Sequence, residues 1–287
     1  MQLIETIDPL RTAVAALKRD GPLAVVPTMG ALHEGHLTLV RAAREQAANV
    51  AASIFVNPRQ FGEGEDLDAY PRQLEADCAA LAREGVALVW APGAAAMYPK
   101  GYATNISVSG VSEGLCGGDR PGHFDGVATV VCKLFNQVQP DLAFFGEKDW
   151  QQLAVIRRMA RDLDLTQPRV ERILGVPTVR EPDGLAMSSR NAYLAAEERS
   201  QAASLPAAMR AAIARLEAGN EAGHVLAELK KRLLQSGFKA VDYAELRDAD
   251  TLEPVEYIAT RAARLLVAAR IGRARLIDNM AVSPPAG

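Results

Sequence analysis

The chain is poor in histidine, cysteine and aromatic residues, and neither sign of charge is in strong excess. Its 287 residues include 4 histidines and 3 cysteines, and phenylalanine, tyrosine and tryptophan together make up 5%. The net charge of −3 does not indicate a broad nucleic-acid-binding surface, which usually requires a marked basic excess. We therefore expect no nucleic-acid partner, although a local basic pocket for phosphate groups is compatible with this composition.

Cys78, Cys116 and Cys132 are widely spaced and form no C-x-x-C pair. This spacing argues against a disulfide framework and a zinc knuckle, so we interpret the cysteines as buried or incidental thiols. No apolar run approaches the roughly 18–20 residues that a membrane span requires. Residues 1–20 carry acidic groups and lack the long apolar core of a signal peptide. These absences predict a soluble cytoplasmic protein that has no membrane partner.

Over the first 180 residues, apolar β-rich runs alternate with segments of helical periodicity. The strand candidates are residues 22–28, 49–56, 86–92, 140–146 and 169–180, and the helix candidates are residues 36–48, 70–85, 126–138 and 150–163. Continuous apolar strands are typical of parallel sheets that are covered on both faces. The pattern predicts an α/β fold with a Rossmann-like parallel sheet and helices on both of its faces.

The composition shifts after about residue 178. Residues 196–236 predict two helices, and short strand candidates follow at 240–249, 264–272 and 275–282. We therefore expect a Rossmann-like domain over residues 1–178 and a small α+β C-terminal domain over residues 179–287.

The stretch PTMGALHEGHLTLV, residues 27–40, places two of the four histidines at a predicted strand-to-helix turn. Gly30 and Gly35 allow close approach of a ligand, and a helix that begins near Gly35 directs backbone N–H groups into the loop. His33 and His36 could then donate hydrogen bonds to phosphate oxygens. Two alternatives are polar surface histidines and zinc ligands, although H-E-G-H lacks the four-residue offset of H-E-x-x-H.

Polar residues follow two other predicted strands. Asn57 and Gln60 suit an uncharged or hydroxylated substrate, or they cap a loop. Lys148 can neutralise a phosphate and Asp149 can hold Mg²⁺, or the two form an ion pair at a helix start. Gln152 lies one helical turn further along the chain.

Two loop segments add candidate groups. Ser188, Ser189 and Arg190 present two hydroxyls and a guanidinium that suit a triphosphate, or they belong to an ordinary loop. The glycine-rich segment 116–131 carries Arg120 and His123, and it is either a flap over the site or an ordinary Ω-loop.

Together these segments resemble the pantothenate synthetases, which are also called pantoate–β-alanine ligases. The resemblance rests on PTMGALHEGHLTLV, FVNPRQFGEGEDLDAYPR, RPGHFDGVATVV, FGEKDWQQL and DGLAMSSRN, in this order, and it covers essentially the whole chain. The His-x-G-His motif alone marks only the wider nucleotidyltransferase superfamily. The resemblance implies an ATP-dependent condensation of (R)-pantoate with β-alanine, through pantoyl adenylate, that yields pantothenate, AMP and pyrophosphate. It also implies Mg²⁺, a homodimer and a place in coenzyme A biosynthesis.

The resemblance further implies roles for individual residues. His36 would be the catalytic proton donor, and the other catalytic groups would be His33, Lys148, Ser188, Ser189 and Arg190. Gln60 and Gln152 would hold pantoate, Asn57 would support its pocket, and Asp149 would bind the metal. The nucleotide-binding residues would be Met29, Gly30, Ala31, Leu32, His33, Glu34, Gly35, His36, Gly146, Glu147, Lys148, Asp149, Val179, Met187, Ser188, Ser189 and Arg190.

Two other functions are compatible with parts of the sequence. One is an adenylyltransferase of the same superfamily that retains AMP in its product, and Gln60, Gln152 and the small C-terminal domain argue against it. The other is a regulatory module that binds a nucleotide without catalysis, and the full set of phosphate, amide and loop groups argues against that. Length and charge leave little room for the RNA-binding domain of a tRNA synthetase.

Overall fold

The computed structural model describes residues 1–62, 64–65, 67–257 and 261–284. The chain divides into two compact units. Unit 1 comprises Met1–Ser112, Arg120–Glu147 and Gln152–Pro177, and unit 2 comprises Glu113–Asp119, Lys148–Gln151 and Thr178–Gly287. The assignment of separate domains to residues 1–178 and 179–287 stays a prediction, because two short segments of the first range group with unit 2.

Unit 1 is built on a parallel sheet, as the apolar runs predicted, and this sheet has six strands. Its strands are β1 (Gln2–Ile4), β2 (Leu23–Thr28), β3 (Asn49–Ile54), β4 (Leu88–Trp90), β5 (Leu142–Gly146) and β6 (Ile173–Val176), in the spatial order β1-β4-β3-β2-β5-β6. Successive residues of β2, such as Val25 and Val26, are both buried because both faces of the sheet are covered. The edge strand β1 was not among the predicted strands.

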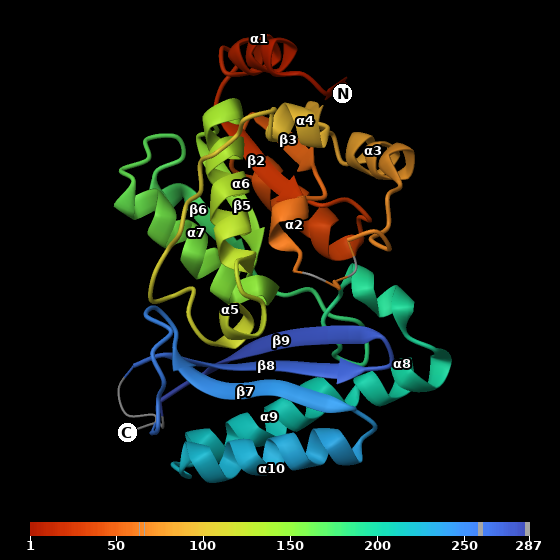
Figure 1. The fold of residues 1–287 in the computed structure, drawn as a ribbon, viewed down its shortest axis with the longest axis vertical. Coiled ribbons are helices and arrows are strands. Elements are labelled where there is room, and N and C mark those ends of the chain that lie inside the picture. Colours follow the sequence, from red (N-terminus) through yellow and green to blue (C-terminus); the bar gives the residue numbers. More distant parts are fainter. Residues whose placement is uncertain (63, 66, 258–260, 285–287) are drawn as a thin grey trace. The chain divides into compact units, whose positions relative to one another are not determined.

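Helices cover both faces of this sheet, which confirms the predicted fold class (Figure 1). The helices of unit 1 are α1 (Ile7–Leu17), α2 (Glu34–Arg44), α3 (Leu74–Arg83), α4 (Ala94–Met97) and α6 (His123–Val138), and α7 (Trp150–Asp162) enters it from unit 2. On one face, Val40 of α2 and Leu81 of α3 pack against Val26 in a single apolar cluster. On the other face, α6 contacts β2 and α1 packs against α6.

The order of the strands creates a switch point beside β2. The chain runs outward from β2 through β3 to β4, and then crosses to β5 and β6 on the opposite side of β2. In open α/β sheets, ligands bind outside the carboxyl ends of the strands at such a point. The loops that follow β2 and β5 are therefore the ones that the topology places at a binding site.

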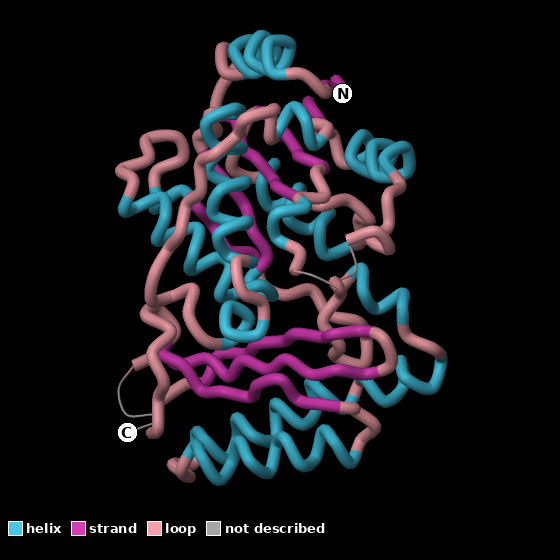
Figure 2. The backbone as a smooth tube through the Cα atoms, in the orientation of Figure 1, coloured by secondary structure: helices cyan, strands magenta, loops and turns pink. Residues whose placement is uncertain are grey.

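Unit 2 contains a three-stranded antiparallel sheet with two long helices packed against it (Figure 2). The strands are β7 (Ala240–Asp248), β8 (Ala263–Ile271) and β9 (Ala274–Val282), in that spatial order, and the helices are α5 (Leu115–Asp119), α8 (Ala196–Ala202), α9 (Ser204–Glu217) and α10 (Ala222–Gln235). Two helices were predicted over residues 196–236, but the structure has three, because α8 and α9 are separate. The break precedes Pro206, which lacks an N–H group and is tolerated in the first turn of α9.

The cysteines and the helix lengths agree with the sequence analysis. All three cysteines are free, and Cys116 and Cys132 are buried. Within the described part of the chain, no helix is both long enough and apolar enough to cross a bilayer.

Gly126 provides a test of how tightly α6 packs in unit 1. A Cβ atom at Gly126 would lie 2.2 Å from the carbonyl oxygen of Arg59, so the two backbones would have to separate. We expect Gly126→Ala to lower the free energy of unfolding by about 1–3 kcal/mol, measured by urea denaturation. Gly118→Ala is the control, because a Cβ atom there meets no heavy atom within 4 Å. Equal effects of the two substitutions would contradict this account.

Candidate active site

A buried carboxylate holds the loop that follows β2. Asp77 of α3 is 1% exposed, and its two oxygens accept hydrogen bonds from the N–H groups of Ala31 and Leu32, each at 2.9 Å. Gly30 and Ala31 have positive φ angles of 83° and 52°, so the chain turns sharply before α2. A Cβ atom at Gly30 would lie 3.0 Å from the Asp77 carboxylate. The buried Asp77 carboxylate therefore holds in place the loop that is proposed to bind phosphates.

Asp77 was missed in the sequence analysis, although the sequence carries a signal for it. In α3 it occupies the same face as Leu74, Cys78 and Leu81, at the spacing of an amphipathic helix. A carboxylate within an apolar stripe must find hydrogen-bond donors, because burial of an unpaired charge is costly. That requirement could have marked Asp77 as a residue that binds a loop.

His33 and His36 lie together at the start of α2, as the motif predicted. Their ring centroids are 4.1 Å apart. His33 is the N-cap residue, and its Nδ1 accepts a hydrogen bond from the Gly35 N–H at 3.2 Å. The Nδ1 of His36 accepts one from the His33 N–H at 3.3 Å. In a neutral imidazole that accepts at Nδ1, the ring proton is carried by Nε2, and such an N–H is a donor suited to an anion.

The position of these rings also favours an anionic ligand. The N-terminus of a helix carries a partial positive charge, which stabilises a phosphate and disfavours a second positive charge on the imidazoles. Glu34, the first residue of α2, is exposed and pairs with Arg41. The carboxylate of Glu34 is thus engaged with a cation of its own helix.

Gln60 lies beside this loop, at the carboxyl end of the neighbouring strand β3. Its Nε2 contacts the sulfur atom of Met29 at 2.9 Å, and its side chain is largely buried. The Nδ2 of Asn57 donates to the Gln60 Oε1 at 3.1 Å and to the Gly126 carbonyl oxygen at 3.1 Å. The Oδ1 of Asn57 accepts from the Tyr98 hydroxyl at 2.8 Å.

These contacts give Asn57 a supporting position. Burial raises the pKa of Tyr98 to about 12, so its hydroxyl stays a donor at neutral pH. With its Nδ2 donating twice and its Oδ1 accepting, the buried Asn57 side chain is occupied by the protein and orients Gln60. Asn57 is thus a loop cap, as one alternative had it, because its side chain also accepts from the Arg59 N–H, and its role in supporting a pantoate pocket stays a prediction.

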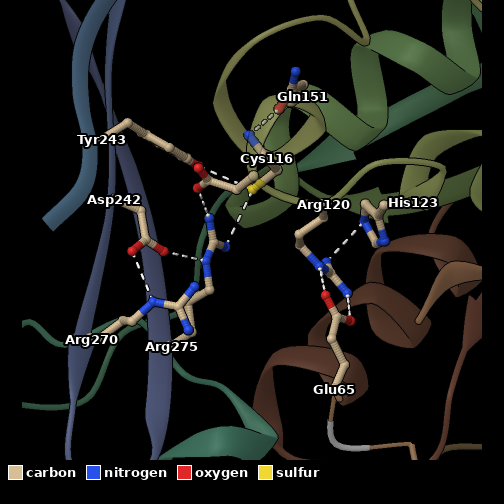
Figure 3. Close-up of polar contacts among 10 residues, drawn as sticks. Glu65, Cys116, Arg120, His123, Gln151, Asp242, Tyr243, Arg270 and Arg275 are labelled. Atoms are coloured by element: carbon tan, nitrogen blue, oxygen red, sulfur yellow. Dashed lines mark hydrogen bonds and ion pairs between the residues drawn. The ribbon is translucent and has the colours of Figure 1, made fainter. Parts of the chain in front are cut away.

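The segment that carries Arg120 and His123 is ordered in unit 1. The Nδ1 of His123 lies 2.7 Å from the Gln60 carbonyl oxygen. Arg120 donates to both Glu65 oxygens, at 2.7 and 2.5 Å (Figure 3). Burial raises the pKa of Glu65, but the hydrogen bonds and charge of Arg120 outweigh it and leave the pKa below its ordinary value. Arg120 and His123 thus fix the backbone of Gln60.

The two adjacent glutamines of α7 have different surroundings. Gln151 is buried, and in unit 2 its Oε1 accepts from the Cys116 N–H at 3.0 Å (Figure 3). Gln152 is half-buried in unit 1, and its side-chain amide forms no hydrogen bond to the residues that the structure describes. Gln152 is therefore the glutamine of this pair whose amide is available to a ligand. Gly146 is the last residue of β5, which is the other strand of the switch point, and Glu147 follows it.

Lys148 and Asp149 belong to unit 2 and form the predicted ion pair. The Lys148 Nζ lies 3.8 Å from an Asp149 carboxylate oxygen, a long contact that a phosphate or a metal ion could replace. The Asn279 Nδ2 donates to the Lys148 carbonyl oxygen at 2.8 Å, and the Trp150 indole N–H donates to the Ala249 carbonyl oxygen at 3.0 Å. The backbone is thus fixed while the ammonium group is weakly held.

Val179 and Met187–Arg190 also belong to unit 2, where they form part of a tight hairpin. The Met187 N–H donates to the Val179 carbonyl oxygen at 3.0 Å. Ser188 caps a short 3₁₀ helix, Ser189–Tyr193, and its hydroxyl accepts from the Arg190 N–H at 3.3 Å. The predicted loop is therefore partly helical, and its serine and arginine follow each other on a turn.

The metal prediction rests on a single carboxylate. Among the described residues, no group of three or more histidine, cysteine, aspartate or glutamate side chains could hold a metal ion. Mg²⁺ commonly binds through one or two carboxylates together with substrate phosphates and water. Asp149, with a 44% exposed side chain, fits that manner of binding.

Comparison with known proteins agrees with these observations. The family model for pantoate-beta-alanine ligase matches residues 2–281. A curated pantothenate synthetase from Novosphingobium aromaticivorans is 70% identical over 285 residues, which are 99% of this chain and 100% of the relative. Another, from Rhizorhabdus wittichii, is 57% identical over 99% of each chain.

Solved structures give the same result. A crystal structure of pantothenate synthetase from Thermus thermophilus matches with a TM-score of 0.87 and 47% identity, covering 99% of this chain and 100% of that one. The Francisella tularensis pantoate-beta-alanine ligase, complexed with beta-gamma ATP and beta-alanine, matches with a TM-score of 0.81 and 31% identity, covering 98% and 97%.

The switch point of the parallel sheet and the imidazoles beside it are the arrangement expected of an α/β protein that binds a phosphorylated ligand. Within that class, the full-length family match and the high identities are specific. The chain belongs to the pantoate–beta-alanine ligase family.

The role of Asp77 can be tested by Asp77→Asn. The substitution would turn one N–H acceptor into a donor, so one of the two loop hydrogen bonds would be lost. Hydrogen bonds to charged groups contribute about 1.5–3 kcal/mol, so we expect ATP binding to weaken by about tenfold or more, measured by titration calorimetry. Glu75→Gln, at an exposed position of the same helix, is the control and should bind ATP normally. Unchanged affinity in the Asp77→Asn protein would exclude the proposed role.

The ion pair of Glu65 and Arg120 predicts a pH dependence of stability. The folded-state pKa of Glu65 is depressed, so its stabilising contribution is complete above the ordinary value of 4.5 and is lost as the pH falls through the folded pKa. We expect Glu65→Gln to cost about 1 kcal/mol at pH 7 in urea unfolding. The difference from wild type should shrink toward pH 3, and a constant difference would contradict the assignment.

Proposed function

We propose that this chain condenses pantoate with β-alanine at the expense of ATP, giving pantothenate, AMP and pyrophosphate through a pantoyl adenylate. The observation that carries the proposal is the pair of imidazoles at the switch point. Both rings accept a backbone N–H at Nδ1, which fixes their orientation at the start of α2, where a phosphate would be stabilised. The names of the relatives, and the ATP and β-alanine in the Francisella tularensis complex, agree with this reaction.

In the first step, a pantoate carboxylate oxygen attacks the α-phosphorus of ATP, and the bond to the bridging oxygen of pyrophosphate breaks. Negative charge moves onto the leaving pyrophosphate, so the step depends on positioning and charge stabilisation. His33 and His36 would donate hydrogen bonds to the phosphates, beside the partial positive charge of α2. Lys148, Ser188, Ser189 and Arg190 would stabilise the charge of the triphosphate.

In the second step, the β-alanine amine attacks the acyl carbon, the bond to the AMP oxygen breaks, and the amine releases its proton. Gln60 and Gln152 would hold pantoate by its hydroxyl and carboxylate groups through both steps. Gln60 is suited to this role because Asn57, Arg120 and His123 fix its side chain and backbone. The backbone around Val179 would contact adenine.

We propose that Mg²⁺ arrives with ATP and that Asp149 contributes a ligand to it. The metal would neutralise charge on the phosphates when it is bound, while Lys148 holds the adjacent charge. A homodimer stays a prediction from the family resemblance, and a cytoplasmic location stays a prediction from the sequence composition. Sedimentation at micromolar concentrations tests the first of these.

His36→Ala tests the role of the imidazoles. The substitution removes a donor to charge that develops during the first step, so we expect adenylate formation to slow by about 10²–10³-fold. Single-turnover measurements with ATP and pantoate give this rate. His224→Ala is the control, because His224 is an exposed histidine of α10 that pairs with Glu228. A normal rate in a folded His36→Ala protein would refute the assignment.

Pyrophosphate release tests the reaction itself. With Mg-ATP and pantoate, we expect about one equivalent of pyrophosphate per site, followed by continuous release and AMP once β-alanine is added. An adenylyltransferase would retain AMP in its product. A regulatory module would bind ATP and release no pyrophosphate under either condition.

A further inference from the structure

Two consecutive polar residues of the edge strand β9 are almost fully buried. Asp278 is 2% exposed and Asn279 is 3% exposed. Successive side chains of a strand point to opposite faces, so these two side chains reach different surroundings. Buried polar groups need partners, and both residues have partners in segments distant in sequence but within unit 2.

Asp278 binds the hairpin that carries Met187–Arg190. Its carboxylate accepts two hydrogen bonds from the Arg180 guanidinium, at 2.7 and 2.9 Å, in a bidentate pair. The same guanidinium donates to the Gly184 carbonyl oxygen at 3.0 Å, and Arg180 pairs with Ala186 in an isolated β-bridge. The Arg180 guanidinium therefore links the two sides of the turn before Met187, and the Asp278 carboxylate holds that guanidinium in place.

Asn279 binds the backbone at Lys148. Its Nδ2 donates to the Lys148 carbonyl oxygen at 2.8 Å, and its Oδ1 accepts from the Arg264 guanidinium. Arg264 also lies over the Trp150 ring, with its Cζ atom 3.4 Å from the ring centroid. The segment Lys148–Trp150 is thus held from both ends by β8 and β9.

We infer that Asp278 and Asn279 are positioning residues for adenylate formation. Asp278 acts through Arg180 on the Met187–Arg190 segment, and Asn279 acts through the Lys148 carbonyl group on the Lys148 ammonium. The inference rests on the proposed function, in which both segments contact the triphosphate. Their attachment to adjacent residues of one strand fixes the spacing between groups that are about 40 residues apart in the chain.

The two half-reactions separate this role from a purely structural one. Adenylate formation requires the groups that hold the triphosphate, whereas the reaction of pantoyl adenylate with β-alanine involves a single phosphate. Misplacement of a catalytic group by about 1 Å can slow a reaction by about 10²-fold. A positioning defect in these segments should therefore slow the first half-reaction and spare the second.

The test uses Asn279→Asp in the full chain. This variant keeps the size of the side chain and the acceptor for Arg264, but it places a second acceptor against the Lys148 carbonyl oxygen. We expect pyrophosphate release from Mg-ATP and pantoate to slow by about 10- to 100-fold in single turnover. The rate of pantothenate formation from supplied pantoyl adenylate and β-alanine should be unchanged. The ratio of the two rates is independent of the fraction of folded protein.

Asn220→Asp is the matched control, because the Asn220 Nδ2 also donates to a backbone carbonyl oxygen of unit 2, that of Arg215, at 2.9 Å. Its rate ratio should equal that of wild type. Asp278→Asn tests the second arm in the same way, and it decides the outcome if Asn279→Asp does not fold. If wild type releases pyrophosphate and the variants keep the wild-type ratio, the inference is overturned and the proposed function stands. Absence of pantoate-dependent release by wild type would overturn the proposed function, and the inference with it.

Discussion

Backbone N–H and C=O groups that leave regular elements need hydrogen-bond partners, and this constraint shapes every segment of the candidate site. An exposed loop satisfies them with water and remains free to move. Here buried side chains satisfy them instead. Asp77 accepts from the loop after β2, and Asn279 donates to the carbonyl group of Lys148. Loops that present groups to a ligand thereby acquire the rigidity of the helices and strands behind them.

The same arrangement separates the fixed charges from those offered to the ligand. The carboxylates of Asp77 and Asp278 are almost fully buried and are engaged by donors of the protein. The groups proposed to contact phosphate are imidazoles, hydroxyls, the Arg190 guanidinium and a lysine whose carboxylate partner lies 3.8 Å away. In each unit, the groups proposed to contact phosphate are thus hydrogen-bond donors, and the buried carboxylates that support their segments are engaged by the protein.

Much of the fold was predictable from local pattern. Continuous apolar runs identified β2, β3, β4 and β5, because a strand buried on both faces leaves a strong signal in sequence. The edge strand β1 has three residues and gave no such signal. The boundary between α8 and α9 also escaped prediction, since alanine-rich sequence favours a helix on either side of it. Here short elements and breaks depended on tertiary contacts rather than on periodicity.

The residues of the candidate site also differ in whether local sequence pattern reveals them. The histidines, Gln60, Lys148 and Ser188–Arg190 could be singled out as candidates because they stand in recognisable motifs at the ends of elements. Asp77, Asp278 and Asn279 were missed because the segments of the candidate site that they bind lie between 45 and 131 residues away in the chain. The sequence shows only that such residues need a partner, because burial of a carboxylate or amide without a hydrogen bond would strongly destabilise the fold. A polar residue within an apolar face therefore signals an unseen partner, and in this protein those partners are the backbone and side-chain groups of the segments that carry the site.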